Sequence, residues 1–104
     1  MPSDDPKLLR LRDAIDQVDR QLLTLFAERM RLVLEVGEFK RTQNLSVYDP
    51  QRERAMLERI ERSAPPPLEG KMARRLFEHV IREFRSKEQD SVSSYPPRAG
   101  ARND

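Results

Sequence analysis

The stretch that decides the fold is the run Lys7–Thr42, KLLRLRDAIDQVDRQLLTLFAERMRLVLEVGEFKRT. No proline interrupts it, and its one glycine is Gly37, which suggests close approach of another backbone or of a ligand. Its apolar residues recur at alternating spacings of four and three, the period of one face of an α-helix. The spacing predicts one helix over 7–42 with a wide apolar band. That band contains Leu11, Ile15, Val18, Leu22, Leu25, Leu32, Val36 and Phe39.

The length of this helix predicts a dimer. At 1.5 Å per residue, roughly 36 residues extend for about 54 Å, whereas a compact 100-residue domain has a radius of gyration of about 13 Å. The chain has 104 residues, of which 37% are hydrophobic and 37% charged, so a monomer would leave the apolar band bare. A second copy of the chain is the simplest cover. We therefore predict an intertwined homodimer.

Two shorter helices follow in the sequence. Asp49 suits an N-cap and Pro50 the first helical position, which predicts a helix from there to about Ser63. Prolines 65–67 end it, and a third helix is expected from about 68–70 to about 89. The apolar side is predicted to contain Met56, Leu57 and Ile60 in the first of these helices, and Met72, Ala73, Leu76, Phe77, Val80, Ile81 and Phe84 in the second.

The last part of the chain has a different composition. Residues 91–104 are rich in Ser, Pro, Gly and charge, which predicts a disordered tail after a helical domain formed by residues 1–90. No strand pattern and no internal repeat occurs in the sequence. The sequence therefore predicts an all-α chain with three helices, one of them very long.

Composition excludes several classes of protein. The chain has no Cys and one His, which excludes disulfides and thiolate zinc sites and makes a metal site unexpected. Its first six residues lack the basic and apolar segments of a signal peptide, and no apolar run approaches the about 20 residues of a membrane span. The net charge of +2 comes from interspersed charges, which argues against nucleic acid binding. We expect a cytoplasmic protein that is not bound to a membrane.

Cations occupy positions where the long helix should be apolar. Arg29 takes the place of an apolar residue in the series, and Lys40 follows eleven residues later, nearly on the same face. Arg12 lies about 100° round the helix from Arg29, so it would reach the same pocket only from a partner helix. Each could also have an ordinary role: Arg12 on the surface, Arg29 in a buried ion pair across the dimer, and Lys40 as a cation extending from a helix end.

Carboxyl groups occupy comparable positions on the shorter helices. Glu88 continues the apolar face that contains Phe77, and Asp49 and Glu53 lie one helical turn apart. The ordinary alternatives are a frayed helix end for Glu88, an N-cap for Asp49, and a surface pair of Glu53 with Arg52 or Arg54. Cations and carboxyls together would suit a small dicarboxylate, because arginine binds carboxylates bidentately.

Four runs carry a resemblance to a known family. They are Leu11–Asp19, Leu22–Arg29, Val36–Lys40 and Val47–Glu53, and in this spacing they resemble the all-helical (AroQ-type) chorismate mutases. The resemblance covers about residues 8–89. It implies an intertwined dimer of three-helix chains, in which each of two active sites takes residues from both chains.

The resemblance also implies roles for individual residues. Arg29 matches an arginine that binds a substrate carboxylate, and Lys40 a lysine that contacts a carboxylate and the ether oxygen. Arg12 matches the arginine supplied by the other protomer. Glu88 matches the position of a Gln, in some members a Glu, that donates to the ether oxygen, so Glu88 would have to be protonated. Phe84 departs from the family, many members of which have Ser there.

The opposite end of the expected site would face the ring of the substrate. Asp49 and Glu53 match positions around the ring hydroxyl, and Arg52 matches a supporting arginine nearby.

The activity implied by the resemblance is the Claisen rearrangement of chorismate to prephenate in the shikimate pathway to phenylalanine and tyrosine. This pericyclic step needs no metal or cofactor. The resemblance also leaves room for docking to another enzyme of the pathway. The alternatives are an isochorismate pyruvate lyase, a mutase acting on 4-amino-4-deoxychorismate, or a non-catalytic helical dimerisation or regulatory module.

Overall fold

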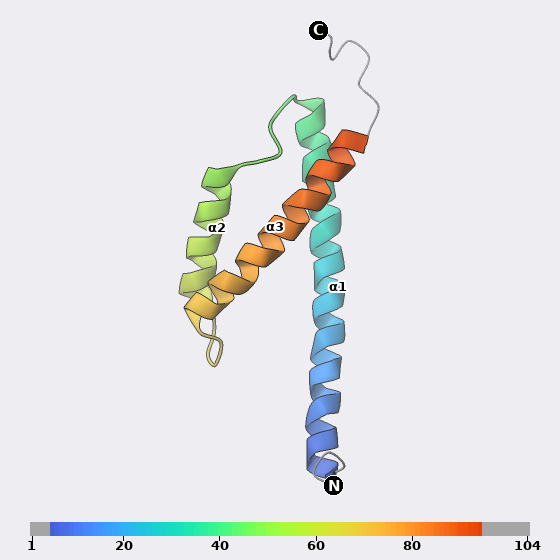
Figure 1. Ribbon diagram of the computed structural model, residues 1–104, viewed down its shortest axis with the longest axis vertical. Helices are drawn as coiled ribbons and strands as arrows, with labels where there is room; N and C mark the ends of the chain where they lie inside the picture. Colours follow the sequence, from blue (N-terminus) through green and yellow to red (C-terminus); the bar gives the residue numbers. More distant parts are fainter. Residues whose placement is uncertain (1–4, 95–104) are drawn as a thin grey trace. The chain divides into compact units, whose positions relative to one another are not determined.

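The computed structural model describes residues 5–94, which form three helices joined by short connections (Figure 1). They are α1 (Pro6–Thr42), α2 (Pro50–Ser63) and α3 (Gly70–Ser94). No strand occurs within 5–94, so the all-α prediction with one very long helix is confirmed. The chain divides into two compact units: the N-terminal unit, up to Leu32, and the C-terminal unit, from Val33.

Helix α1 has local signals at both ends. The Asp5 carboxylate accepts a hydrogen bond from the backbone N–H of Lys7 at 2.8 Å and so caps the first turn. Lys40 and Arg41 lie in the last turn, where positive charge suits the helix dipole. Asn44 then takes a φ of 58°, a left-handed conformation that Asn tolerates better than most residues. The predicted helix therefore agrees with the observed one to within a residue.

The N-terminal unit consists of helix whose apolar side chains are exposed. Leu11 is 54% exposed, Ile15 58% and Val18 52%, and together with Ala14 they line one open apolar surface. An exposed face of this kind is typical of a surface that another element covers. The apolar band predicted from the sequence is therefore present and bare in the single chain.

In the C-terminal unit, α2 and α3 pack against each other (Figure 1). Ala73 and Ile81 of α3 form its most buried apolar core, and the Arg74 guanidinium pairs with the Glu61 carboxylate of α2 at 3.1 Å. The predicted apolar side is only partly covered in the single chain, because Leu76 remains 50% exposed.

Helix α3 is longer than predicted. It continues to Ser94 instead of ending at about Gln89, so residues 91–94 of the predicted tail lie within a helix. The physical reason is that residues 90–94 contain neither Pro nor Gly, and the Val92 side chain packs beside Gly37 of α1. The rest of the predicted tail, 95–104, lies outside the described residues.

None of the helices in the described range combines the length and the apolar character that a membrane span requires.

Candidate active site

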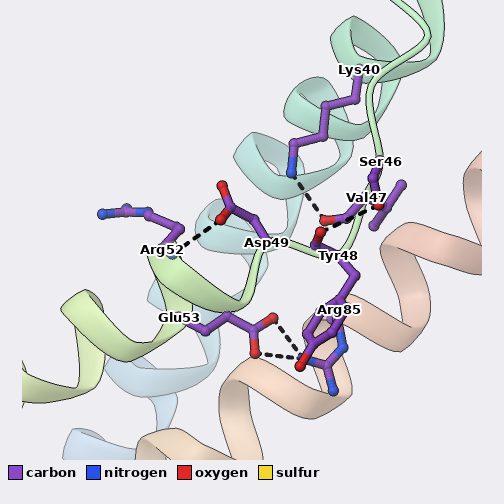
Figure 2. Close-up of polar contacts among 8 residues, drawn as sticks. All are labelled: Lys40, Ser46, Val47, Tyr48, Asp49, Arg52, Glu53 and Arg85. Atoms are coloured by element: carbon purple, nitrogen blue, oxygen red, sulfur yellow. Dashed lines mark hydrogen bonds and ion pairs between the residues drawn. The ribbon is translucent and has the colours of Figure 1, made fainter.

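The candidate site in the C-terminal unit gathers residues from three helices and one connector (Figure 2). Lys40 comes from the last turn of α1, the connector 46–49 passes beside it, and Glu53 lies in the first turn of α2. Helix α3 contributes Arg85 and, one turn later, Glu88. The structure thus brings together residues that are up to about fifty positions apart in the sequence.

Lys40 is half-buried and linked to the connector. Its ammonium Nζ donates a hydrogen bond to the backbone carbonyl of Val47 at 3.0 Å (Figure 2). An ammonium group has three donor hydrogens, so this bond fixes its direction and leaves donor capacity for a ligand. Because the Val47 carbonyl is neutral, it does not cancel the positive charge of Lys40.

Glu88 is the one buried charged residue in the C-terminal unit as described, with 7% of its surface exposed. Its Oε2 atom is buried and has no hydrogen-bond partner among residues 5–94. Burial raises the pKa of this carboxyl, the Lys40 charge acts to lower it, and the Glu53 charge raises it further. The net direction is upward, which favours the protonated form, and that form can donate a hydrogen bond.

Gly37 allows α3 to approach α1 closely. A Cβ atom at this position would lie 2.9 Å from Cγ of Glu88 and 3.3 Å from Cγ2 of Val92. The sequence predicted close approach here by a backbone or a ligand, whereas the structure places side chains of α3 there. The absence of a side chain at Gly37 therefore leaves the space that Glu88 occupies.

Glu53 pairs with a residue that the sequence analysis missed. Nη1 of Arg85 donates to Oε1 of Glu53 at 2.5 Å and to Oε2 at 2.6 Å (Figure 2). The alternative pairing of Glu53 with Arg52 or Arg54 is not the one that the structure shows. The available signal was spacing: Arg85 precedes Glu88 by three residues, which places both on neighbouring turns of one helix face.

Tyr48 completes this cluster. The Arg85 guanidinium carbon lies 4.7 Å from the centre of the Tyr48 ring, within the range of a cation–π interaction. We refer to Tyr48, Glu53 and Arg85 as the ring-end cluster, because Glu53 matches a ring-hydroxyl position in the resemblance above.

Asp49 acts as the predicted N-cap. Its Oδ1 atom accepts a hydrogen bond from the backbone N–H of Arg52 at 3.1 Å, and Pro50 occupies the first helical position (Figure 2). This cap starts α2 at the residue that places Glu53 in its first turn. Contact of Asp49 or Arg52 with a substrate stays a prediction.

Two predicted site residues lie in the other unit. Arg12 and Arg29 are both on α1 before Leu32, and the Arg12 side chain is exposed. Phe84 is half-buried on α3. No group of three or more His, Cys, Asp or Glu in the described range could hold a metal ion.

Comparison with known sequences identifies the family. Residues 11–89 match the family chorismate mutase type II. The T-protein of Enterobacter agglomerans is 43% identical over 89 residues, which are 81% of this chain and 23% of that protein. The bifunctional chorismate mutase/prephenate dehydratase of Escherichia coli strain K12 is 40% identical over 84 residues, 80% of this chain and 22% of that protein. The chain thus spans less than a quarter of the length of these relatives.

Solved structures agree with this match. Form II of the chorismate mutase from Thermus thermophilus is 34% identical with a TM-score of 0.77, over 80% of this chain and 94% of that one. The chorismate mutase from Helicobacter pylori in complex with prephenate is 25% identical with a TM-score of 0.80, over 88% of this chain and 100% of that one. With its helical fold and most of its sequence matched, the chain belongs to the chorismate mutase type II family, a family of isomerases.

Proposed function

We propose that this chain catalyses the rearrangement of chorismate to prephenate. The observation that carries the proposal is the Lys40 ammonium held near the buried Glu88, whose pKa is raised, in a chain of this family. The Helicobacter pylori relative, described in complex with prephenate, supports the same choice of product.

The reaction is an isomerisation, so it needs no co-reactant. The ether C–O bond between the ring and the enolpyruvyl arm breaks, a C–C bond forms between the arm and the ring, and all atoms stay in one molecule. Binding must hold the flexible arm over the ring, which removes much of the entropic part of the barrier. Negative charge develops on the ether oxygen in the transition state, and Lys40 and protonated Glu88 would donate hydrogen bonds to it.

The remaining cations would come from α1. Arg29 would bind one substrate carboxylate, and Arg12 would serve the site of a second copy of the chain. The bare apolar face formed by Leu11, Ile15 and Val18 supports a homodimer, because a second copy would cover it. At the ring end, Glu53 would accept a hydrogen bond from the ring hydroxyl, with Asp49 nearby.

The product would be used in aromatic amino-acid biosynthesis in the cytoplasm. Relatives described as bifunctional chorismate mutase/prephenate dehydratase combine two successive activities in one protein. This chain would therefore pass prephenate to an enzyme that consumes it, either attached to it or docked on it.

The decisive experiment is incubation of the purified protein with chorismate and identification of the product by NMR. Prephenate as the sole product is the expected result. Separate incubations with isochorismate and with 4-amino-4-deoxychorismate test the sister reactions, which would release pyruvate from the former or rearrange the latter. Absence of turnover with all three, in a folded protein, would instead favour a helical dimerisation or regulatory module.

A further inference from the structure

We propose that Arg85 determines substrate specificity, by making the ring end of the site accept a neutral hydroxyl and reject a charged ammonium. This inference rests on the proposed function, because it takes Glu53 to face the ring substituent of the substrate. It concerns a residue of α3 that neither the sequence pattern nor the family resemblance singled out.

Arg85 forms a close ion pair with Glu53. A single nitrogen of Arg85, Nη1, lies 2.5 Å from one oxygen of Glu53 and 2.6 Å from the other. The two side chains are 26% and 20% exposed, so solvent screens the pair less than it would screen an ion pair on the surface. Paired with a guanidinium in this way, the Glu53 carboxylate serves as a hydrogen-bond acceptor only.

Within this ion pair, Glu53 can still bind a hydroxyl group. An ionised carboxylate has about four lone-pair positions, and one bridging nitrogen uses only the inner position of each oxygen. The outer positions remain able to accept the hydrogen of a hydroxyl group. Since Arg85 neutralises the carboxylate charge, a second cation gains little attraction to Glu53 and meets repulsion from Arg85.

Two contacts hold Arg85 in place. Besides its ion pair with Glu53, its guanidinium lies 4.7 Å from the centre of the Tyr48 ring, so two contacts fix its direction. Tyr48 belongs to the connector that Lys40 holds through Val47, so the ring is itself positioned by the site. The positive charge thus stays beside the ring substituent.

The chemistry that distinguishes the two substituents is simple. A hydroxyl is neutral near pH 7, whereas an alkyl amine is largely protonated there, as lysine is. The 4-amino analogue of chorismate differs from chorismate at that substituent, so it is the probe for this inference.

The test compares kcat/KM for chorismate with kcat/KM for the amino analogue at pH 7. Where the analogue is not turned over, its inhibition constant relative to the KM of chorismate gives the same comparison. In Arg85→Gln the preference for chorismate should fall by about tenfold or more, the size of one partly screened charge interaction. Arg85→Lys, which keeps the charge, should retain most of the preference.

Arg82→Gln is the matched control. It makes the same change one turn earlier on α3, at an exposed residue. Nη1 of Arg82 lies 3.4 Å from Nδ1 of His79. The preference of this variant for chorismate over the amino analogue should equal that of the unchanged protein. A preference in Arg85→Gln within about twofold of the unchanged value would overturn the inference.

A measurement on the unchanged protein covers the case in which Arg85→Gln does not fold. As pH rises through the pKa of the free amino analogue, the ammonium becomes neutral and the preference for chorismate should fall. The same measurement on Glu88→Gln, in which position 88 does not titrate, serves as the control for any contribution of Glu88 to this ratio. A ratio that stays flat across this pH range would contradict the inference. Failure of the unchanged protein to convert chorismate would contradict the proposed function instead, so the two failures are distinguishable.

Discussion

The two units of the chain use charged residues in opposite ways. In the N-terminal unit, Arg12 lies on a helix whose apolar side is open, and no other described element of that unit packs against it. In the C-terminal unit, Glu88 is buried and each site residue has neighbours that fix it: Val47 for Lys40, Arg85 for Glu53 and Gly37 for Glu88. Charged groups of the C-terminal unit are thus held in place within one chain, whereas the surroundings of Arg12 depend on what covers the open face of the N-terminal unit.

The largest expected effect tests whether the N-terminal unit contributes a residue to the active site of a second copy of the chain. Arg12→Ala and Arg29→Ala homodimers should each lose about a thousandfold or more in kcat/KM, because a buried carboxylate contact is removed. Coexpression of the two variant chains should restore about a quarter of the normal activity, since half of the dimers are mixed and each has one intact site. The assay is prephenate formation by the coexpressed mixture.

Arg20→Ala, an exposed residue of the same unit, is the control and should leave activity nearly normal. Two inactive variants that stay inactive together would show that the site is not shared in this way.

The second-largest expected effect tests the role of Lys40 in the C-terminal unit. Lys40→Ala should lower kcat by about a hundredfold to a thousandfold, the usual cost of removing one donor from a charge-stabilising site. Steady-state kinetics measure this change, and Lys87→Ala, an exposed lysine on α3, is the matched control. Normal turnover in the Lys40 variant would exclude its role at the ether oxygen.

The third prediction concerns pH. The pKa of Glu88 is raised by burial and by Glu53 of α2, against the Lys40 charge on α1, and Arg85 is the cation one turn away on α3. Because the protonated form donates, activity should fall as pH rises through the raised pKa, and Glu88→Gln should flatten that profile. A pH–rate profile of kcat for both proteins decides the point, and identical profiles would remove Glu88 from the mechanism.

The same shift has a consequence for stability. Above the ordinary pKa of Glu, the folded chain holds a proton at Glu88 that the unfolded chain has lost. The contribution to stability is therefore complete below the unfolded pKa and is lost as pH rises through the folded pKa. Urea unfolding measured across this pH range should show a decline in the free energy of unfolding. Glu88→Gln should remove that pH dependence.

The smallest expected effect concerns packing. Gly37→Ala adds a Cβ at 2.9 Å from Glu88 Cγ, inside a normal contact distance, and should destabilise the fold by about 1–3 kcal/mol. Better helix propensity offsets up to about 1 kcal/mol of this. Thermal unfolding measures the difference.

The double variant Gly37→Ala/Glu88→Ala lacks the Glu88 Cγ atom that the new methyl group would meet. Adding Gly37→Ala to the Glu88→Ala protein should therefore cost much less stability than adding it to the unchanged protein. Equal costs in the two proteins would contradict the close contact.

Much of the architecture was readable from short-range patterns. The period of the apolar series gave α1, and Asp49 with Pro50 gave the start of α2, because both signals act within a few residues along the chain. The positions of Arg29, Lys40 and Glu88 in apolar series marked them as candidates for the same reason. The end of α3 was missed because the composition of residues 91–94 says nothing about Val92 packing beside Gly37.

Arg85 shows the limit of such patterns. On its own helix it is one of several arginines, and Arg74, Arg75 and Arg82 have the same local chemistry. Its partner Glu53 is 32 residues away, and only the packing of α2 against α3 brings the two together. A pairing over that separation has no local signature in the sequence.

Local sequence thus sufficed for what depends on neighbouring residues: the existence of the three helices, the Asp49 cap and the faces on which charges lie. The burial of Glu88, the direction of its pKa and the pairing of Glu53 with Arg85 depend on atoms brought close by folding, because burial and Coulomb interactions act through space and not along the chain. The long run Lys7–Thr42 specified a helix with cations in its apolar band, and the fold specified the buried carboxyl, Glu88, whose pKa one of those cations, Lys40, acts to lower.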